Sequence, residues 1–392
     1  MANNDTIPFA RPFVGTEEEE AVLRVLRSFW LTTGAEALAF EKEFGEFLNL
    51  PAAFCFAVNS ATSGLHLAME ACGVGPGDLV LVPSYTFTST AEVARYLGAD
   101  PVFVDVAPGT FHIDGPAMEA ALRKLPPGKA KAVSPVHYGG LPCDMGPIMD
   151  VAHRYGLKVI EDAAHSFPSA MGESYAGAIG DVGVFSFYAT KTITTGEGGM
   201  LLCSDGEIAR RVSVMRLHGI DRTVWNRYSD TKASWYYEVV DAGYKYNMPD
   251  LLAAIGRVQL TRARDLLRMR EEIAASYDLA FGGDDRFLLP PTGTGDARHL
   301  YPLRLNPRRL RISREEFIDK LKEAGIGTSV HFIPLHIMPF YKNRYHLAED
   351  DFPETMKSYK QEISLPIWPG MTTAQVARVI EAVQTIANNN AV

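Results

Sequence analysis

The sequence predicts an α/β fold, a mostly parallel sheet covered by helices on both faces, followed by a smaller α+β domain. Between residues 50 and 215, short continuous apolar runs alternate with helix-length segments, which is typical of parallel strands buried on both faces. After about residue 250, long helical stretches and isolated short strands replace this rhythm. We therefore predict a large domain over residues 1–250 and a small C-terminal domain over 251–392, with residues 1–40 free to pack on either.

The individual elements follow from apolar periodicity and turn residues. In the large domain, strands are predicted at residues 52–58, 79–82, 102–106, 131–136, 158–162 and from 182. Helices are predicted after residue 64, from about 115 and from about 144. In the small domain, the prediction is helices at 251–267, 314–324 and 373–387 and strands at 301–305 and 328–332. Ligands bind beyond the carboxyl ends of parallel strands, so polar residues just after an apolar run are candidates for the site.

Composition narrows the class of protein. The 392 residues carry 38 basic and 47 acidic side chains, a net charge of −9, which argues against a protein that neutralises nucleic-acid phosphates. The four cysteines are scattered without CxxC spacing, which favours a reduced, cytoplasmic protein over a metal or disulfide framework. No apolar run approaches the ~18 residues of a membrane span, and no secretory signal is visible. We expect a cytoplasmic enzyme that contacts no membrane.

Lys191 is the first candidate catalytic residue. It follows an apolar run that begins at Val182 and precedes a turn with glycines at positions 196, 198 and 199. A partly desolvated lysine near another cation has a lowered pKa and can act as a nucleophile, and glycines let the backbone approach a ligand closely. The alternative is a surface lysine on a β-turn, and this segment alone leaves both interpretations open.

Two carboxylates and a histidine, Glu161, Asp162 and His165, end the predicted buried strand before this segment. An enzyme that uses pyridoxal 5'-phosphate (PLP) needs an acid beside the ring nitrogen, because the protonated ring is the electron sink. Asp162 at a strand end fits that need; the alternatives are an acidic metal site or a helix-capping aspartate. A metal is disfavoured, because His331 and His336 are five residues apart and nothing completes a ligand set.

A phosphate site is predicted where Ser60-Ala61-Thr62-Ser63-Gly64 joins a strand to a helix. Amides and hydroxyls at a helix start bind phosphate, although an ordinary capped helix start has the same pattern. Ser186 precedes Lys191 by five residues and adds a hydroxyl. Phe87 follows another strand, and its flat ring can stack on a cofactor ring; the alternative is that it packs in the hydrophobic core. Along one parallel sheet, these features together describe a PLP site.

These residues resemble a known family, the sugar-nucleotide aminotransferases of the DegT/StrS type, which are PLP enzymes of the aspartate-aminotransferase-like fold (fold type I). The resemblance covers nearly the whole chain, and the sequence is most similar in appearance to UDP-4-amino-4-deoxy-L-arabinose-type enzymes. The matching blocks are residues 30–34, 60–64, 83–90, 136–140, 161–165, 185–191, 196–199, 243–248, 325–332 and 364–369.

The resemblance implies catalytic roles for Lys191, which would form the Schiff base with the cofactor and shuttle a proton, and for Asp162 at the ring nitrogen. It implies that His165, where many relatives carry glutamine, contacts the ring hydroxyl or stacks nearby. Tyr188 stands where many relatives carry histidine, so no role is carried over to it. The other residues that the resemblance implies for cofactor binding are Thr62, Ser63, Phe87, Ser186 and, from the second subunit of a homodimer, Asn247.

On the substrate side, the resemblance implies Thr33 and His331 as nucleotide-sugar contacts, against a loop hydroxyl and an interior histidine as alternatives. The donor carboxylate and the pyrophosphate each need a cationic partner. The candidates are Arg222, Arg227 and Lys245, and the sequence does not indicate which of them binds which group.

The implied reaction is transamination of a nucleotide-linked keto sugar, a UDP-4-keto sugar in the first instance, with L-glutamate as amino donor. The product would be an amino sugar for cell-surface polysaccharide or lipopolysaccharide. The alternatives are amination at C-3 of a dTDP- or UDP-3-keto sugar, a PLP lyase, or a non-enzymatic regulator on the same fold. A dehydratase of this family would carry histidine in place of Lys191.

Overall fold

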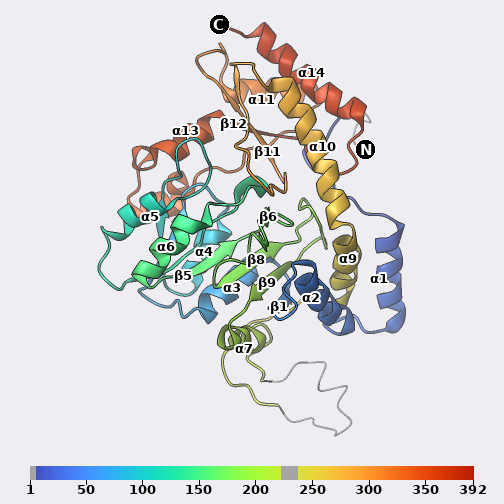
Figure 1. Ribbon diagram of the computed structural model, residues 1–392, viewed down its shortest axis with the longest axis vertical. Coiled ribbons are helices and arrows are strands. Elements are labelled where there is room, and N and C mark those ends of the chain that lie inside the picture. The colour runs from blue at the N-terminus through green and yellow to red at the C-terminus, as the bar shows by residue number, and fades with distance from the viewer. Residues whose placement is uncertain (1–5, 222–236) are drawn as a thin grey trace.

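The structure is a computed structural model that describes residues 6–221 and 237–392. Figure 1 shows a large sheet flanked by helices and, above it, a small sheet with the C-terminal helix, connected by a long helix. Within the described residues, no helix is both long and apolar enough to cross a bilayer.

The large sheet has seven strands in the order β1-β9-β8-β5-β4-β2-β3. Every neighbouring pair from β8 to β3 is parallel, and β9 is antiparallel to both of its neighbours. This confirms the predicted mostly parallel α/β sheet. The strands are β1 (Phe54–Val58), β2 (Leu79–Pro83), β3 (Asp100–Val104), β4 (Ala130–Val133), β5 (Lys158–Asp162), β8 (Val182–Ser186) and β9 (Gly199–Cys203).

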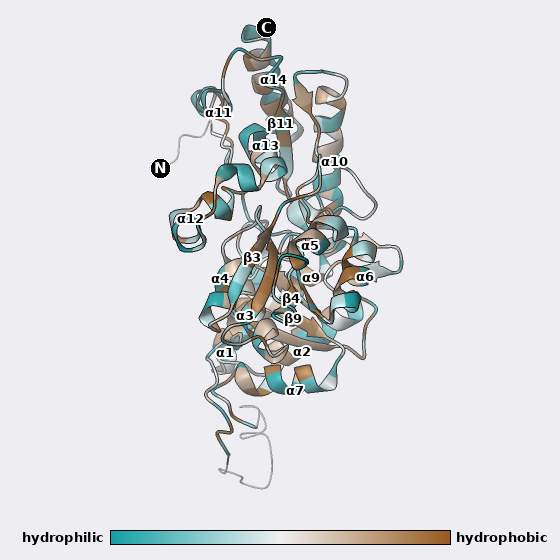
Figure 2. Cartoon of the chain, turned by 90° about the vertical axis from the view of Figure 1, so that its left-hand side faces the viewer, coloured by the Kyte–Doolittle hydropathy of each residue, from teal (hydrophilic) through white to brown (hydrophobic). Residues whose placement is uncertain are grey.

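Helices cover both faces of this sheet, whose strands consist mostly of buried apolar residues. β8 and β9 are buried at every position, and Figure 2 shows hydrophobic residues concentrated along the strands with hydrophilic ones on the outer helix turns. The helices are α2 (Ala35–Phe47), α3 (Ala61–Ala71), α4 (Ser89–Tyr96), α5 (Gly115–Leu122), α6 (Met145–Tyr155) and α7 (Gly206–Met215). A short hairpin of β6 (Ala170–Met171) and β7 (Ser174–Tyr175) follows β5.

The small domain is built on an antiparallel three-stranded sheet in the order β10-β11-β12. Its core gathers apolar side chains such as Leu303, Phe317 and Val379 from the sheet and its helices. Its elements are β10 (Phe287–Leu288), β11 (Tyr301–Leu305), α11 (Arg314–Glu323), α13 (Pro353–Gln361), β12 (Glu362–Leu365) and α14 (Thr373–Asn389). Between α11 and α13 the chain forms α12 (Pro339–Tyr345), which packs on the core of the large sheet through Tyr341. Single 3₁₀ turns lie at Tyr138–Gly140, Leu335–Ile337 and Glu349–Asp351.

Two helices join the domains, α9 (Asp250–Thr261) and α10 (Ala263–Phe281). Leu260, Ala263 and Leu266 pack in the core under the large sheet, whereas Ile273 and Tyr277 belong to the small-domain core. Helix α10 therefore runs from one core into the other. The predicted division at residue 250 falls at the start of this helix pair.

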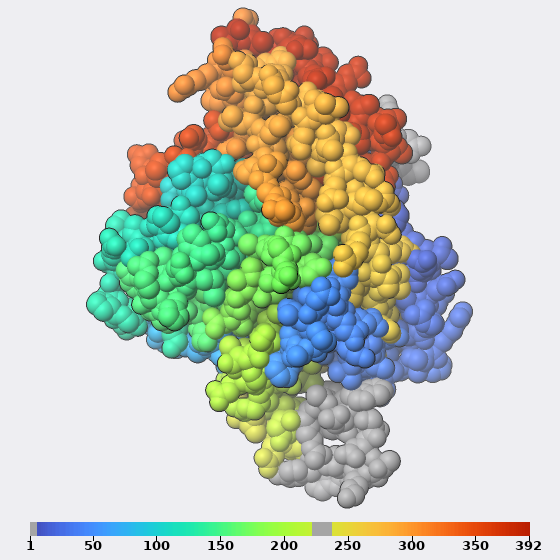
Figure 3. All heavy atoms as spheres, in the orientation of Figure 1, coloured from blue at the N-terminus to red at the C-terminus, as the bar shows by residue number. Residues whose placement is uncertain are grey.

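The N-terminal segment contacts both domains. Ile7 pairs with Ile326 of the small domain in a single parallel bridge and belongs to its core. Helix α1 (Thr16–Ser28) and α2 then pack on α9. Figure 3 shows the blue N-terminal helices seated against the yellow α9–α10 segment. The strand Tyr301–Leu305 and the start of the final helix match their predicted positions.

Two predicted elements of the small domain need correction. The helix predicted over residues 251–267 is interrupted at Arg262, where α9 ends and α10 begins. The strand predicted over 328–332 is wrong: that segment makes one isolated bridge, Ser329 with Ser364, and then turns into the space between the domains. The third strand of the small sheet is instead β12, whose apolar content is diluted by Glu362 and Ser364.

Candidate active site

A cavity of about 450 Å³ lies between the carboxyl edge of the large sheet and the small domain. Parallel α/β sheets bind ligands at this edge, and the volume suits a small-molecule site. Seven of the residues singled out from sequence line this cavity: Thr62, Phe87, Asp162, His165, Ser186, Lys191 and His331. Three others, Thr33, Ser63 and Asn247, are outside its lining.

Lys191 sits on the turn that follows β8, held by a hydrogen bond from its backbone N–H to the Tyr188 carbonyl at 2.9 Å. Burial in the cavity lowers the pKa of its amine to about 7; the charge of Asp162 opposes that shift and the charge of Arg270 adds to it. An amine with such a pKa is largely uncharged just above neutral pH. It therefore has a lone pair available as a nucleophile and base.

Asp162 ends β5 on the cavity side of the sheet. One carboxylate oxygen accepts the Thr90 hydroxyl at 2.7 Å and the other accepts the Ala164 N–H at 3.2 Å. Burial raises the pKa of Asp162, and the Thr90 and Ala164 hydrogen bonds and Lys191 oppose the rise. A buried carboxylate with only two hydrogen bonds retains capacity to pair with a cation in the cavity.

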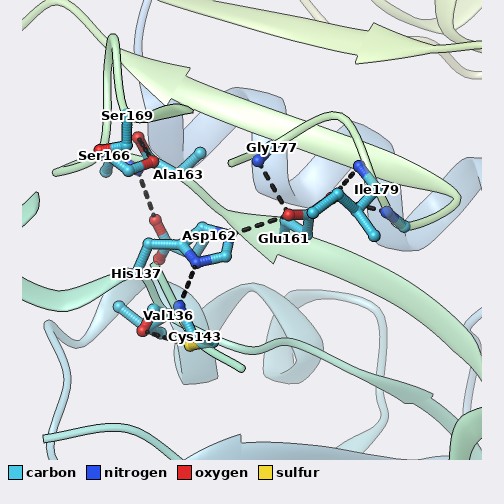
Figure 4. A network of polar contacts seen from close by, with 12 residues as sticks. Val136, His137, Cys143, Glu161, Asp162, Ala163, Ser166, Ser169, Gly177 and Ile179 are labelled. Carbon is cyan, nitrogen blue, oxygen red and sulfur yellow. Dashed lines mark hydrogen bonds and ion pairs between the residues drawn. The ribbon is translucent and has the colours of Figure 1, made fainter. Parts of the chain in front are cut away.

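Glu161, one residue earlier, points to the opposite face of the strand (Figure 4). Its carboxylate accepts the His137 Nε2–H at 2.8 Å and the backbone N–H groups of Gly177, Ile179 and Gly180 at 2.8, 2.7 and 2.6 Å. Burial disfavours its charge, but these donors overcome that effect and lower the pKa of Glu161. Successive side chains alternate across a strand, so the two carboxylates of the motif serve different surroundings.

His165 forms part of an aromatic wall. Its Nδ1 accepts the Gly139 N–H at 3.2 Å, which leaves the proton of a neutral imidazole on Nε2. Burial, together with the charge of Lys191, lowers the pKa of His165, so the ring is neutral. Phe332 stacks on it with centroids 5.6 Å apart, and Phe87 contacts Phe332 at 5.9 Å. The cavity thus offers an N–H donor next to flat apolar rings.

The start of α3 shapes the phosphate end of the cavity. The Ser60 hydroxyl caps the helix by accepting the Ser63 N–H at 3.1 Å, and the first amides of a helix have no partner within it. Ser60, Ala61, Thr62 and Ser186 line the cavity here. The Ser63 hydroxyl donates to Asn59 at 2.7 Å, so it supports the helix start from behind, and its direct role toward phosphate stays a prediction.

Gly199 makes this approach of strand and helix possible. A Cβ at that position would lie 2.9 Å from the Ala61 nitrogen and 2.7 Å from the Phe185 carbonyl oxygen. Both contacts are to backbone, which has no room to yield. The glycine-rich turn predicted to let the backbone approach a ligand thus brings β9 against the first turn of α3.

Thr33, Lys245 and Asn247 form a separate cluster. The Lys245 amine donates to the Asn247 side-chain oxygen at 2.6 Å, and the Asn247 side-chain N–H₂ donates to the Thr33 hydroxyl. Thr33 in turn donates to the Met248 carbonyl at 2.5 Å. None of the three lines the cavity of its own chain. The other candidate cations, Arg222 and Arg227, lie outside the described residues.

His299 is a cavity residue that sequence reasoning missed. It lies just before β11, its ring is 4.5 Å from that of His165, and its buried Nδ1 makes no hydrogen bond within the described residues. The signal available in the sequence was a histidine beside a predicted strand, at 301–305, but nothing indicated that this end of the strand faces the large sheet. Phe9, which also lines the cavity, lay in no motif, and Phe332 lay in the matching block 325–332 without an assigned role.

PLP makes three demands: an amine for its aldehyde carbon, an anion beside its ring nitrogen and donors for its phosphate. Lys191, Asp162 and the α3 terminus with Thr62 and Ser186 meet these demands in one cavity. His165, whose Nδ1 accepts a backbone N–H, lines the same cavity. On a mostly parallel sheet with a C-terminal α+β domain, this combination defines a PLP-dependent enzyme of fold type I.

Comparison with known proteins identifies the family. Residues 12–384 match the model of the DegT/DnrJ/EryC1/StrS aminotransferase family, and the chain belongs to that family. The spore coat polysaccharide biosynthesis protein SpsC of Bacillus subtilis is 46% identical over 387 residues, which cover 98% of this chain and 97% of that protein.

Solved structures agree. The putative sugar aminotransferase Spr1654 from Streptococcus pneumoniae, in its PMP form, is 30% identical with a TM-score of 0.89, covering 98% of this chain and 99% of that one. Its PLP form matches with a TM-score of 0.88. Helicobacter pylori PseC, an aminotransferase involved in the biosynthesis of pseudoaminic acid, is 26% identical with a TM-score of 0.88, covering 98% and 100%. The chain is a PLP-dependent sugar aminotransferase.

Proposed function

We propose that this enzyme transfers the amino group of L-glutamate to the 4-keto position of a UDP-linked sugar. The amino sugar nucleotide then serves polysaccharide or lipopolysaccharide synthesis at the cell surface. Lys191 facing Asp162 in the cavity carries the transaminase chemistry. The substrate class rests on the resemblance of the sequence to UDP-4-keto-sugar enzymes, and the similarity to SpsC supports a polysaccharide product.

PLP, when bound, supplies the electron sink that lets a C–H bond next to nitrogen ionise. Asp162 would hold positive charge at the ring nitrogen, and the His165 Nε2–H would donate to a ring oxygen. The Lys191 amine removes a proton from the donor α-carbon in the first half-reaction. In the second half-reaction it delivers a proton to the sugar carbon that gains nitrogen, and within each half-reaction the amine both takes up and gives back one proton, as base and then as acid. Its pKa of about 7 suits both tasks.

We further propose that the working unit is a homodimer in which Asn247 completes the neighbour's phosphate site. Asn247 is buried yet lies outside the cavity of its own chain, next to Lys245. Among the described residues that line the cavity, Lys191 is the sole lysine or arginine. The carboxylates and phosphates of the substrates need further cations, and Lys245 of the second copy, which contacts Asn247 within its own chain, is our candidate for one.

A substrate panel tests the proposed reaction. Purified enzyme loaded with PLP is incubated with L-glutamate and, separately, with UDP- and dTDP-linked 4-keto and 3-keto sugars. We expect 2-oxoglutarate and amino sugar in equal amounts from the UDP-4-keto sugar. Product from the 3-keto sugars alone would move the assignment to C-3 amination, and no amino sugar from any member would contradict the proposal.

Mixed dimers test the shared site. Lys191→Ala and Asn247→Asp are each expected to be strongly impaired, the second because it places an anion beside phosphate. If Asn247 acts across the interface, half-and-half mixing creates heterodimers with one intact site. Activity should then return to about a quarter of the wild-type value, by the statistics of a two-fold dimer. An Asn247 that acts within its own chain gives no such recovery.

A further inference from the structure

A chain of three polar side chains leads away from the cavity into the small domain. Glu362 and Ser364 lie two residues apart on β12, on the same face, and both are fully buried. The Ser364 hydroxyl donates to Glu362 Oε1 at 2.5 Å, and Ser364 Oγ lies 2.9 Å from Nδ1 of His331. His331 lines the cavity. The chain therefore joins a buried carboxyl group to an imidazole at the substrate space.

The backbone fixes the orientation of this chain. The His331 N–H donates to Glu362 Oε2 at 3.1 Å, so Oε2 is an acceptor and Oε1 faces Ser364. When Glu362 is ionised, the Ser364 O–H points to Oε1 and Ser364 Oγ accepts Nδ1–H. The His331 Nε2 is then a bare acceptor toward the cavity.

Protonation of Glu362 reverses the chain. The Oε1–H then donates to Ser364 Oγ, the Ser364 O–H donates to Nδ1, and Nε2 carries the hydrogen. In both arrangements the imidazole is neutral. The two arrangements differ by one proton, which enters at Nε2 and ends on Glu362.

The surroundings favour a neutral imidazole beside a carboxyl group that titrates near neutral pH. Burial and the charge of Lys191 lower the pKa of His331 to about 4. Burial raises the pKa of Glu362 to about 8 against the hydrogen bonds of Ser364 and His331 and the charge of Arg314. The charged and titratable groups that face the chain are Arg314, Tyr85 and Tyr138 around Glu362 and Lys191, His165 and His299 around His331.

We propose that Glu362, Ser364 and His331 form a proton relay that deprotonates the ammonium group of the amino donor in the cavity. The N–H bond of the ammonium breaks and its electron pair stays on nitrogen. The proton passes to His331 Nε2, the Nδ1 proton passes to Ser364 Oγ, and the serine proton passes to Glu362 Oε1. The reverse sequence returns the proton to the amine of the product, so one catalytic cycle is balanced.

Transamination needs this step because an amino acid arrives as an ammonium ion, which has no lone pair for attack. A single imidazole would become a cation next to Lys191 after taking the proton. The relay avoids that charge by storing the proton on Glu362, away from the cavity. In these terms His331 is a catalytic residue, and Ser364 and Glu362 are positioning residues. The relay rests on the transamination chemistry and is independent of which sugar accepts the amine.

Glu362→Gln is the most direct test. The His331 N–H selects the amide oxygen of glutamine for the Oε2 position, so the amide N–H₂ faces Ser364 and holds the relay in its protonated arrangement. We expect kcat/KM for the glutamate half-reaction, followed by cofactor absorbance, to fall about 10²-fold at neutral pH. The deficit should shrink above about pH 8, where Glu362 of the wild type is already ionised and the ammonium begins to lose its proton in solution. A deficit that is the same at every pH would overturn the relay.

Control variants separate chemistry from folding. Glu272→Gln makes the same change on the exposed face of α10, where the side chain is 63% exposed, and should leave rate and pH profile unchanged. Ser364→Ala breaks the relay without changing a charge and should reproduce the pH-dependent deficit of Glu362→Gln. A wild-type rate for Ser364→Ala would overturn the proposal.

A measurement without turnover checks the proton store itself. In infrared difference spectra of the PLP-loaded enzyme across neutral pH, a buried carboxylic-acid C=O band should titrate in wild type and Glu272→Gln and be absent from Glu362→Gln. The ¹⁵N shifts of His331 should show the Nε2–H tautomer at all pH values in Glu362→Gln and a change of tautomer in wild type. Absence of that tautomer change in wild type would overturn the relay, while failure of the sugar panel would leave these spectra unaffected.

Discussion

The two faces of β5 carry the same chemical group in opposite situations. Glu161 and Asp162 are consecutive, both buried and both carboxylates. Glu161 accepts four hydrogen bonds from an imidazole and three backbone amides, and its pKa is lowered. Asp162 accepts two, and its pKa is raised. The Glu161 carboxylate is therefore fully hydrogen-bonded within the protein, whereas the Asp162 carboxylate retains acceptor capacity for a further partner.

The difference separates structural from catalytic use of a buried charge. A buried ion with all its lone pairs satisfied fixes the local chain, here the turn over residues 177–180 that follows the β6–β7 hairpin. A buried ion with spare acceptor capacity costs free energy in the protein alone and recovers it when a cation binds. Asp162, on the cavity face of β5, is therefore stabilised when a cationic ligand binds, whereas Glu161, on the core face, contributes to the stability of the protein alone.

The largest expected effect comes from removing the amine that faces Asp162. Lys191→Ala should still fold, because the Lys191 side chain makes no ion pair with the residues that the structure describes, but turnover should fall on the order of 10⁴-fold. The visible absorbance of the lysine–cofactor bond should vanish while cofactor still co-purifies. Added methylamine should restore part of the rate. Normal turnover in this variant would contradict the assignment of Lys191.

The second prediction compares the two carboxylates of β5, Asp162 on the cavity face and Glu161 on the core face. Asp162→Asn removes the negative charge that we propose pairs with the ring nitrogen, and it should reduce kcat on the order of 10³-fold with the fold intact. Glu161→Gln, the matched change one residue away, should leave kcat within a few-fold in whatever fraction is folded. Steady-state kinetics normalised to bound cofactor gives both values. Equal losses of kcat would mean that the two faces are not functionally distinct.

The sequence was sufficient for the sheet and the cavity floor because both depend on local pattern. Lys191 and Asp162 follow continuous apolar strands, so their position at the carboxyl edge comes from periodicity alone. His299 and the Glu362–Ser364–His331 chain could not be found this way, because they depend on how the small domain docks on the large one. The strand at 328–332 was predicted wrongly for the same reason. The strand that completes the small sheet is β12, about 30 residues further along the chain, and its buried glutamate is a residue type that strand propensities disfavour.

The third prediction concerns the core face. In Glu161→Gln, His137 and three backbone N–H groups are left with one amide oxygen as acceptor. The new amide N–H₂ also faces other hydrogen-bond donors, with which it cannot pair. Removing one partner of a buried ionic network costs about 3 kcal/mol. We expect the free energy of unfolding in urea to fall by that amount, with the m-value unchanged. A loss well under 1 kcal/mol would show that the network contributes little to stability.

The smallest effect is the pH dependence of stability, which should have opposite signs on the two faces. The folded-state pKa of Glu161 is lowered, so its stabilisation is present above its unfolded value and is lost as pH falls through the folded value. The folded-state pKa of Asp162 is raised, so its contribution is lost as pH rises through the folded value.

Cofactor-free Asp162→Asn should therefore be more stable than wild type at pH 7, by about 1 kcal/mol. That gain should disappear below about pH 4, where Asp162 is protonated in both folded and unfolded chains. Urea titrations of the cofactor-free proteins at both pH values measure this. Added PLP should stabilise wild type more than Asp162→Asn, because only the aspartate recovers its desolvation cost through the ring cation. A variant less stable than wild type at pH 7 without cofactor would show that Thr90 and Ala164 already satisfy the charge.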